Sequence, residues 1–120
     1  MYFFLSGGIL NGWIFSIWGL WDYVKEYKDS KAEDILHRTL KTLEDALPEY
    51  DLGYWSKYED DKRISSPFYH KLHVAQLKVM YELTGKNIYN VFAEKWAKCQ
   101  SHRLNRMVAF VIKAKQKVVE

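Results

Sequence analysis

With 120 residues, the chain has room for at most one domain with a modest hydrophobic core. Apolar residues make up 48% of it and aromatic residues 17%, which excludes an intrinsically disordered chain. The net charge of +3 is spread among acidic residues, so it excludes the basic patch of a nucleic-acid-binding domain and fits an anionic ligand only weakly.

The N-terminal segment is uncharged as far as Trp21, a length that also fits a transmembrane helix. Four glycines, the polar Asn11 and three tryptophans interrupt it, and no Lys or Arg precedes it as in a signal peptide. We therefore predict a buried helix from about residue 9 to residue 28 and no membrane partner. A small membrane-anchored protein is the alternative, and the sequence assigns no compartment.

A second helix is predicted to begin at Ser30 and to end at Pro48. Ser30 followed three residues later by Glu33 forms a capping-box pattern, and proline cannot continue a helix. The apolar residues of this segment are spaced for one buried face: Ile35, Leu36, Leu40, Leu43 and Leu47.

No helical period continues through residues 49–67, so a long loop is expected there. Loops of this length in compact domains are usually functional or disordered. This one is rich in aromatic residues, which favours a functional loop over a disordered one: Tyr50, Tyr54, Trp55 and Tyr58.

Three more helices are predicted after the loop. The third spans about residues 68–83 and ends at the Thr84-Gly85-Lys86 sequence. Its apolar stripe consists of Leu72, Ala75, Val79 and Leu83, with Leu77 and Met80 beside it. Asn87 is the expected cap of a fourth helix, which reaches about residue 98 with Ile88, Val91, Phe92 and Trp96 facing inward. The last, over residues 103–119, is basic.

These elements predict an all-α fold of antiparallel helical hairpins. The single cysteine, Cys99, excludes an internal disulfide, and the sequence contains no Gly-rich phosphate loop. His70 and His73 are three residues apart and can share a helix face. No further ligands accompany them, so we predict no metal site and no cofactor.

Four motifs follow one another within residues 9–98. They are ILNGWIFS at 9–16 with GLWD at 19–22, LPEYDLG at 47–53, YHKLHVAQL at 69–77 and FAEKW at 92–96. In this order they resemble the C-terminal domain of D-glucuronyl C5-epimerases, which reads L-N-G-F-x-Y-S with G-L-x-D, L-P-x-Y-D-x-G, Y-H-x-x-H-I-x-Q-L and F-x-x-x-W. Tyr58-Glu59 stands where the family has Tyr-Asp. The arginine that follows that pair in the family is absent, and the nearest cations are Lys62 and Arg63.

The resemblance implies that residues 9–98 are part of an (α/α) barrel or toroid. Residues 1–8 would be the remnant of an upstream region, and residues 99–120 a basic C-terminal helix. Upstream domains of the same enzyme, or a second copy of the chain, are the implied protein partners. The isolated chain is therefore expected to associate and to be inactive, since its first helix would expose some of its apolar residues: Phe3, Phe4, Trp13, Ile14, Trp18 and Trp21.

The activity implied by the resemblance is inversion of C5 of D-glucuronate units in a heparosan- or heparan-like polysaccharide. Tyr58 and Tyr69 match the family's catalytic tyrosines, one removing the C5 proton and the other delivering a proton to the opposite face. A tyrosine normally has a pKa of about 10, so the one that acts as base needs nearby cations or donors. The expected substrate-binding residues are His70, His73, Arg63, Lys62, Tyr54, Trp55 and Asn11.

Two other functions fit the same residues. A uronate polysaccharide lyase also removes the C5 proton and often uses tyrosine and histidine. A non-catalytic module would hold an acidic glycan on the aromatic loop without turning it over.

Overall fold

The computed structural model describes residues 8–59 and 63–119. Within these residues the chain is helical and contains three isolated β-bridges but no extended strand, which confirms the predicted all-α fold. The elements follow one another as α2 (Leu10–Tyr27), α3 (Ser30–Ala46), the 3-10 helix η1 (Leu47–Tyr50), α4 (Pro67–Thr84), α5 (Asn87–Ser101) and α6 (Arg103–Val119).

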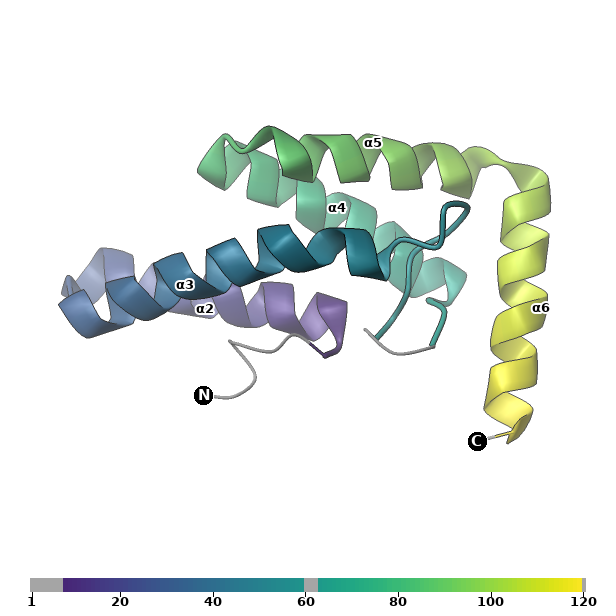
Figure 1. Cartoon of the computed structure of the whole chain (residues 1–120), viewed down its shortest axis with the longest axis horizontal. Coiled ribbons are helices and arrows are strands. Elements are labelled where there is room, and N and C mark those ends of the chain that lie inside the picture. Colours follow the sequence, from purple (N-terminus) through teal and green to yellow (C-terminus); the bar gives the residue numbers. More distant parts are fainter. Residues whose placement is uncertain (1–7, 60–62, 120) are drawn as a thin grey trace.

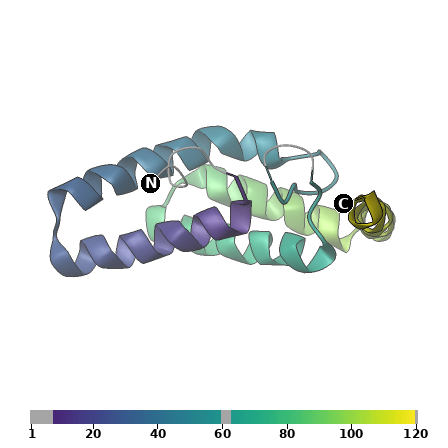
Figure 2. The same ribbon diagram turned by 90° about the horizontal axis from the view of Figure 1, so that it is seen from below.

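Helices α2 to α5 lie side by side as two antiparallel hairpins, and α6 crosses one end of them (Figure 1). Helix α2 packs against both α3 and α4, and α4 packs against α5. Figure 2 looks along α6 while the other four helices are seen from the side. The starts of α2 and α4 therefore meet the ends of α3 and α5 near α6, and the described part of the loop lies at this same end.

One hydrophobic core joins the two hairpins, and its largest members are Trp13 and Trp96. The Trp13 indole N–H donates to Thr39 Oγ1 at 2.9 Å, which satisfies the polar atom of a fully buried ring. Burial of each large apolar side chain contributes about 1.5–3 kcal/mol. A second, smaller cluster connects the loop to α5 and α6 and consists of Trp55, Ile64, Cys99 and Ala109.

Helix α3 begins with Asp29 as its N-cap, so the prediction that Ser30 is the cap is wrong. The Asp29 Oδ1 atom accepts hydrogen bonds from the backbone N–H groups of Lys31 at 2.9 Å and Ala32 at 3.3 Å. A carboxylate at this position also interacts favourably with the positive end of the helix dipole.

Replacing Asp29 by Ala should lower the free energy of unfolding by about 1 kcal/mol, the usual effect of removing an N-cap side chain. Ser30→Ala is the matched control, because Ser30 is an exposed helical residue with no capping bond described, and it should change stability little. Urea unfolding of both variants measures the difference. A larger loss in the serine variant would show that the capping assignment is wrong.

The buried face of α4 differs from the apolar stripe predicted from its spacing. Val79 and Leu83 are 37% and 42% exposed, and Ala75 is exposed as well. Polar side chains enter the core and form hydrogen bonds there; for example, Gln76 Nε2 donates to the backbone oxygen of Asn11 at 3.0 Å. The buried residues of α4 are His70, His73, Val74, Gln76, Leu77 and Met80.

Helix α5 begins at Asn87, whose predicted capping role is wrong because Lys86 occupies the N-cap position without a side-chain bond. The predicted inward residue Val91 is 49% exposed. The expected inward direction of Trp96 is confirmed, and Ile88 and Phe92 pack half-buried beside the core. The fully buried positions are Tyr89, Ala93, Trp96 and Cys99.

Helix α2 is covered on one side only. Six residues were predicted to include the exposed apolar surface. Trp13 and Ile14 are instead fully buried beneath neighbouring helices, and Trp18 and Trp21 are half-buried. Phe3 and Phe4 lie outside the described residues. The uncovered side instead carries three aromatic residues: Phe15 is 47% exposed, Tyr23 is 45% exposed and Tyr27 is 67% exposed. None of the described helices combines the length and the apolar character that crossing a bilayer requires.

Candidate functional site

The two tyrosines predicted to be catalytic lie beside each other at the end of the hairpins near α6. The ring centroids of Tyr58 and Tyr69 are 5.0 Å apart and the ring planes are inclined by 54°. Tyr58 comes from the loop and Tyr69 from the first turn of α4, so the fold brings together two side chains that are eleven positions apart in sequence. Both are half-buried and therefore reach solvent.

The backbone of Tyr58 is held on both sides. Its N–H donates to the carbonyl oxygen of Arg63 at 2.7 Å, and its own carbonyl accepts from the N–H of Leu10 at 3.0 Å. The neighbouring residues Lys57 and Ile64 form an antiparallel bridge. Tyr58 thus occupies a fixed position between the loop and the first residue of α2, although no regular strand holds it.

Tyr69 owes its position to the start of α4. Proline at residue 67 suits the first helical position because it has no N–H to leave unpaired. The hydroxyl of Ser66 accepts from the backbone N–H of Tyr69 at 3.3 Å and caps the helix. At the other end, Gly85 adopts the left-handed conformation with φ of 71°, which confirms the predicted C-cap.

A chain of buried hydrogen bonds fastens the loop to α4 and α5. A carbonyl oxygen only accepts, so the 2.7 Å contact between His70 Nε2 and the Trp96 oxygen places the ring proton of His70 on Nε2. His70 Nδ1 then accepts from the hydroxyl of Ser56 at 2.8 Å and from its N–H at 3.1 Å. Ser56 Oγ also lies 3.0 Å from His73 Nδ1, within hydrogen-bonding distance. We call this series, from His73 through Ser56 and His70 to the Trp96 carbonyl, the histidine chain.

Burial lowers the pKa of both histidines. Desolvation, aided by the neighbouring His70, lowers the pKa of His73 to about 3. Desolvation also lowers the pKa of His70, although the hydrogen bond to Trp96 acts in the opposite direction. The two rings are therefore neutral near neutral pH and cannot bind a carboxylate through charge. Their contacts give them a role in positioning the loop.

Stability should fall in acid because of His73. An unfolded histidine has a pKa of about 6.5, so between that pH and about pH 3 the unfolded chain binds a proton that the folded chain does not. The stabilisation is complete above about pH 6.5 and is lost as the pH falls, by about 1.4 kcal/mol per pH unit for this group. At pH 5 the loss from His73 alone should be about 2 kcal/mol.

Urea unfolding of the wild type and of His73→Asn between pH 7 and pH 4 measures this slope, which the substitution should reduce. His37→Asn is the control, because the side chain of His37 is 70% exposed and removing it should leave the slope as it was. Equal slopes in all three proteins would contradict the assignment.

Asp51 connects the loop to α5. Its carboxylate accepts from the N–H of Gly53 at 2.9 Å and from the indole N–H of Trp96 at 3.2 Å, and it forms an ion pair with Lys95. Burial acts to raise the pKa of Asp51, but the bonds from Lys95, Gly53 and Trp96 outweigh it and hold that pKa below its usual value. The aspartate of the LPEYDLG motif is thus a structural residue.

The remaining predicted substrate-binding residues lie in different surroundings. Trp55 is fully buried and stacks on His70 with a centroid distance of 3.9 Å, while Tyr54 is half-buried beside α6. Arg63 is paired with Glu59 at 3.3 Å. Asn11 lies half-buried in the first turn of α2, and Lys62 falls outside the described residues. That these residues contact substrate remains a prediction, and the same holds for the two histidines.

Several residues of this region were not identified from the sequence. Ser56 and Ser65 are fully buried in the loop, with their hydroxyl oxygens 3.2 Å apart. Lys113 of α6 places its Nζ atom 5.2 Å from the centroid of the Tyr58 ring. No sequence signal shows that a serine of a polar loop is buried. Nor does the sequence predict that a helix some fifty residues after Tyr58 packs against the loop.

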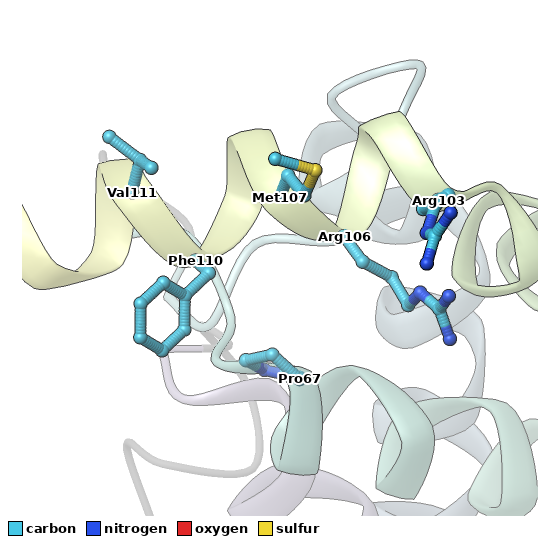
Figure 3. A pocket seen from close by; sticks show the side chains of 6 residues that line it. All are labelled: Pro67, Arg103, Arg106, Met107, Phe110 and Val111. Atoms are coloured by element: carbon cyan, nitrogen blue, oxygen red, sulfur yellow. The ribbon is translucent and has the colours of Figure 1, made fainter.

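A separate hollow of about 390 Å³ lies between α6 and the start of α4 (Figure 3). Two arginine side chains lie at one end, and Phe110 and Val111 lie at the other, with Pro67 opposite α6. None of the predicted site residues lines it. Among the described residues no group of His, Cys, Asp and Glu is arranged to hold a metal ion.

Comparison with known proteins identifies the family of this chain. Residues 6–98 match the family model described as D-glucuronyl C5-epimerase C-terminus. A curated relative, the uncharacterized protein MJ1128 of Methanocaldococcus jannaschii, is 31% identical over 88 residues, which cover 73% of this chain and 29% of the relative. The chain thus spans less than a third of that relative's length. With three quarters of its residues matched to the model, the chain belongs to the family of D-glucuronyl C5-epimerase C-terminal domains.

Proposed function

We propose that this domain is the part of a uronate C5-epimerase that carries its two catalytic tyrosines. The observation that supports this most directly is the contact between the rings of Tyr58 and Tyr69, which come from two separate motifs of the family. The substrate class would be a polysaccharide with D-glucuronate units of the heparosan or heparan type. Neighbouring hairpins of an (α/α) toroid, from upstream domains or from a second copy, would supply the rest of the binding surface.

The reaction requires an acid and a base on opposite faces of the sugar. Removal of the C5 proton by one phenolate leaves an enolate of the uronate carboxylate, and the other phenol then delivers a proton to the opposite face. The rings of Tyr58 and Tyr69 are in contact, so a sugar does not fit between them. The C5 atom would therefore lie beside the pair, within reach of both hydroxyl groups, and not between the two rings.

The surroundings of the pair suit an anionic substrate. Helices α2 and α4 both begin at this end of the molecule, and neither has an acidic residue in its first turn. The positive ends of two helix dipoles therefore favour negative charge nearby. This supports uronate as the ligand over a neutral sugar.

Deuterium incorporation at C5 tests the proposal. A glucuronate polymer is incubated in D₂O with the protein at its natural length, and the C5 position is followed by NMR. Deuterium at C5 together with iduronate is the expected result. An unsaturated product that absorbs in the ultraviolet would show a lyase instead, and binding without exchange would show a non-catalytic glycan-binding module.

A further inference from the structure

Helix α6 lies outside the region matched by the family, yet it contacts the candidate site. Its inner face packs on the loop through Ala109, which is fully buried, and through Ile112. Farther along the same face, Gln116 Oε1 accepts from the backbone N–H of Ile64 at 3.2 Å. Residues three and four apart share one side of a helix. Lys113 therefore lies between fixed contacts on both sides and is directed at Tyr58.

Two other cations near the loop have acidic partners. Arg63 is paired with Glu59 at 3.3 Å, and Lys95 is paired with Asp51. Lys113 takes part in no ion pair within the part of the chain that the structure describes, and its amine lies 5.2 Å from the Tyr58 ring centroid.

We propose that α6 completes the site and that the Lys113 ammonium binds the carboxylate of the uronate whose C5 lies at Tyr58 and Tyr69. The inference rests on the proposed function, since it assumes a uronate at the tyrosine pair. A cation in this place stabilises the substrate carboxylate. It stabilises the enolate still more, because the negative charge on the carboxylate oxygens increases when the C5 proton leaves.

The experiment measures binding of two oligosaccharides to the chain by isothermal titration calorimetry at low salt. One contains glucuronate units, and in the other each carboxylate has been reduced to an alcohol. Lys113→Met should weaken binding of the glucuronate oligosaccharide about tenfold, as expected for loss of one charge-assisted hydrogen bond, and leave the neutral one unchanged. Lys113→Arg should retain most of the affinity.

Lys115→Met is the matched control, since it removes the same charge from an exposed position of the same helix, and it should keep nearly the full affinity. Thermal unfolding of each variant shows whether α6 still packs. If Lys113→Met binds as tightly as the wild type, or if the two methionine variants lose affinity equally, the role of Lys113 is wrong while the proposed function stands. If the wild type does not prefer the glucuronate oligosaccharide, both proposals fail.

Discussion

Replacing either Tyr58 or Tyr69 by Phe should lower the rate of deuterium exchange at uronate C5 by about 10²–10⁴-fold, the usual contribution of a positioned acid or base. The substitution removes only a hydroxyl group. In both residues the ring rather than the hydroxyl makes the described contacts, so packing between the loop and α4 should be kept. NMR detection of C5 exchange with the protein at its natural length provides the rate.

Tyr81→Phe is the control for this experiment, because Tyr81 lies in the same helix as Tyr69 but near its C-terminal end, where it is 39% exposed. It should retain most of the exchange rate. If both Phe variants at the pair exchange C5 at nearly the wild-type rate, these tyrosines are not the acid and the base. If only one of them loses activity, the pair provides a single catalytic group and the other lies elsewhere.

Replacing Trp96 by Ala should have the largest effect on stability, about 3–5 kcal/mol. Its ring is fully buried in the core and its indole N–H donates to Asp51, and both contributions are lost in the variant. Small domains are stable by about 5–15 kcal/mol, so the substitution should remove a large part of the stability and would bring a domain at the lower end of that range close to unfolding. Urea unfolding followed by circular dichroism measures the loss.

Trp96→Phe separates packing from hydrogen bonding at the same position. It keeps an aromatic ring in the core and loses the bond to Asp51, so it should cost about 1–2 kcal/mol. Equal losses in the Ala and Phe variants would show that the bond to Asp51, and not the volume of the ring, is the main contribution. A loss below about 1 kcal/mol in both would contradict the central position of Trp96.

The sequence predicts the helices well because their ends carry local chemistry. Pro48, Pro67 and Gly85 mark boundaries that the structure confirms within a few residues. The start of α3 is misassigned by one residue because Asp29 and Ser30 are adjacent and both are favoured caps. Only the geometry of the first turn distinguishes them.

The buried face of α4 could not be predicted from apolar spacing. His70, His73 and Gln76 enter the core and form hydrogen bonds there with Ser56, Trp96 and Asn11, and these partners lie on other elements. Lys113 was missed for the same reason, since its place at Tyr58 depends on how α6 packs on the loop. Tyr58 and Tyr69 were predicted from their resemblance to the family motifs. The residues that hold them in place contact them only in the folded chain, so the spacing of residues in the sequence does not predict them.

The histidine chain has a consequence for the order in which the domain folds. The α2–α3 and α4–α5 hairpins join segments that are neighbours in sequence, and such contacts form quickly. The loop that carries Tyr58 has little regular structure, and Ser56 attaches it to His70 and His73 on a separate helix. Closing that loop involves a loss of chain entropy that contacts with other elements must offset. The tyrosine pair should therefore be the last part of the domain to assemble and the first to open in local unfolding, so that the candidate site is lost before the helical scaffold is.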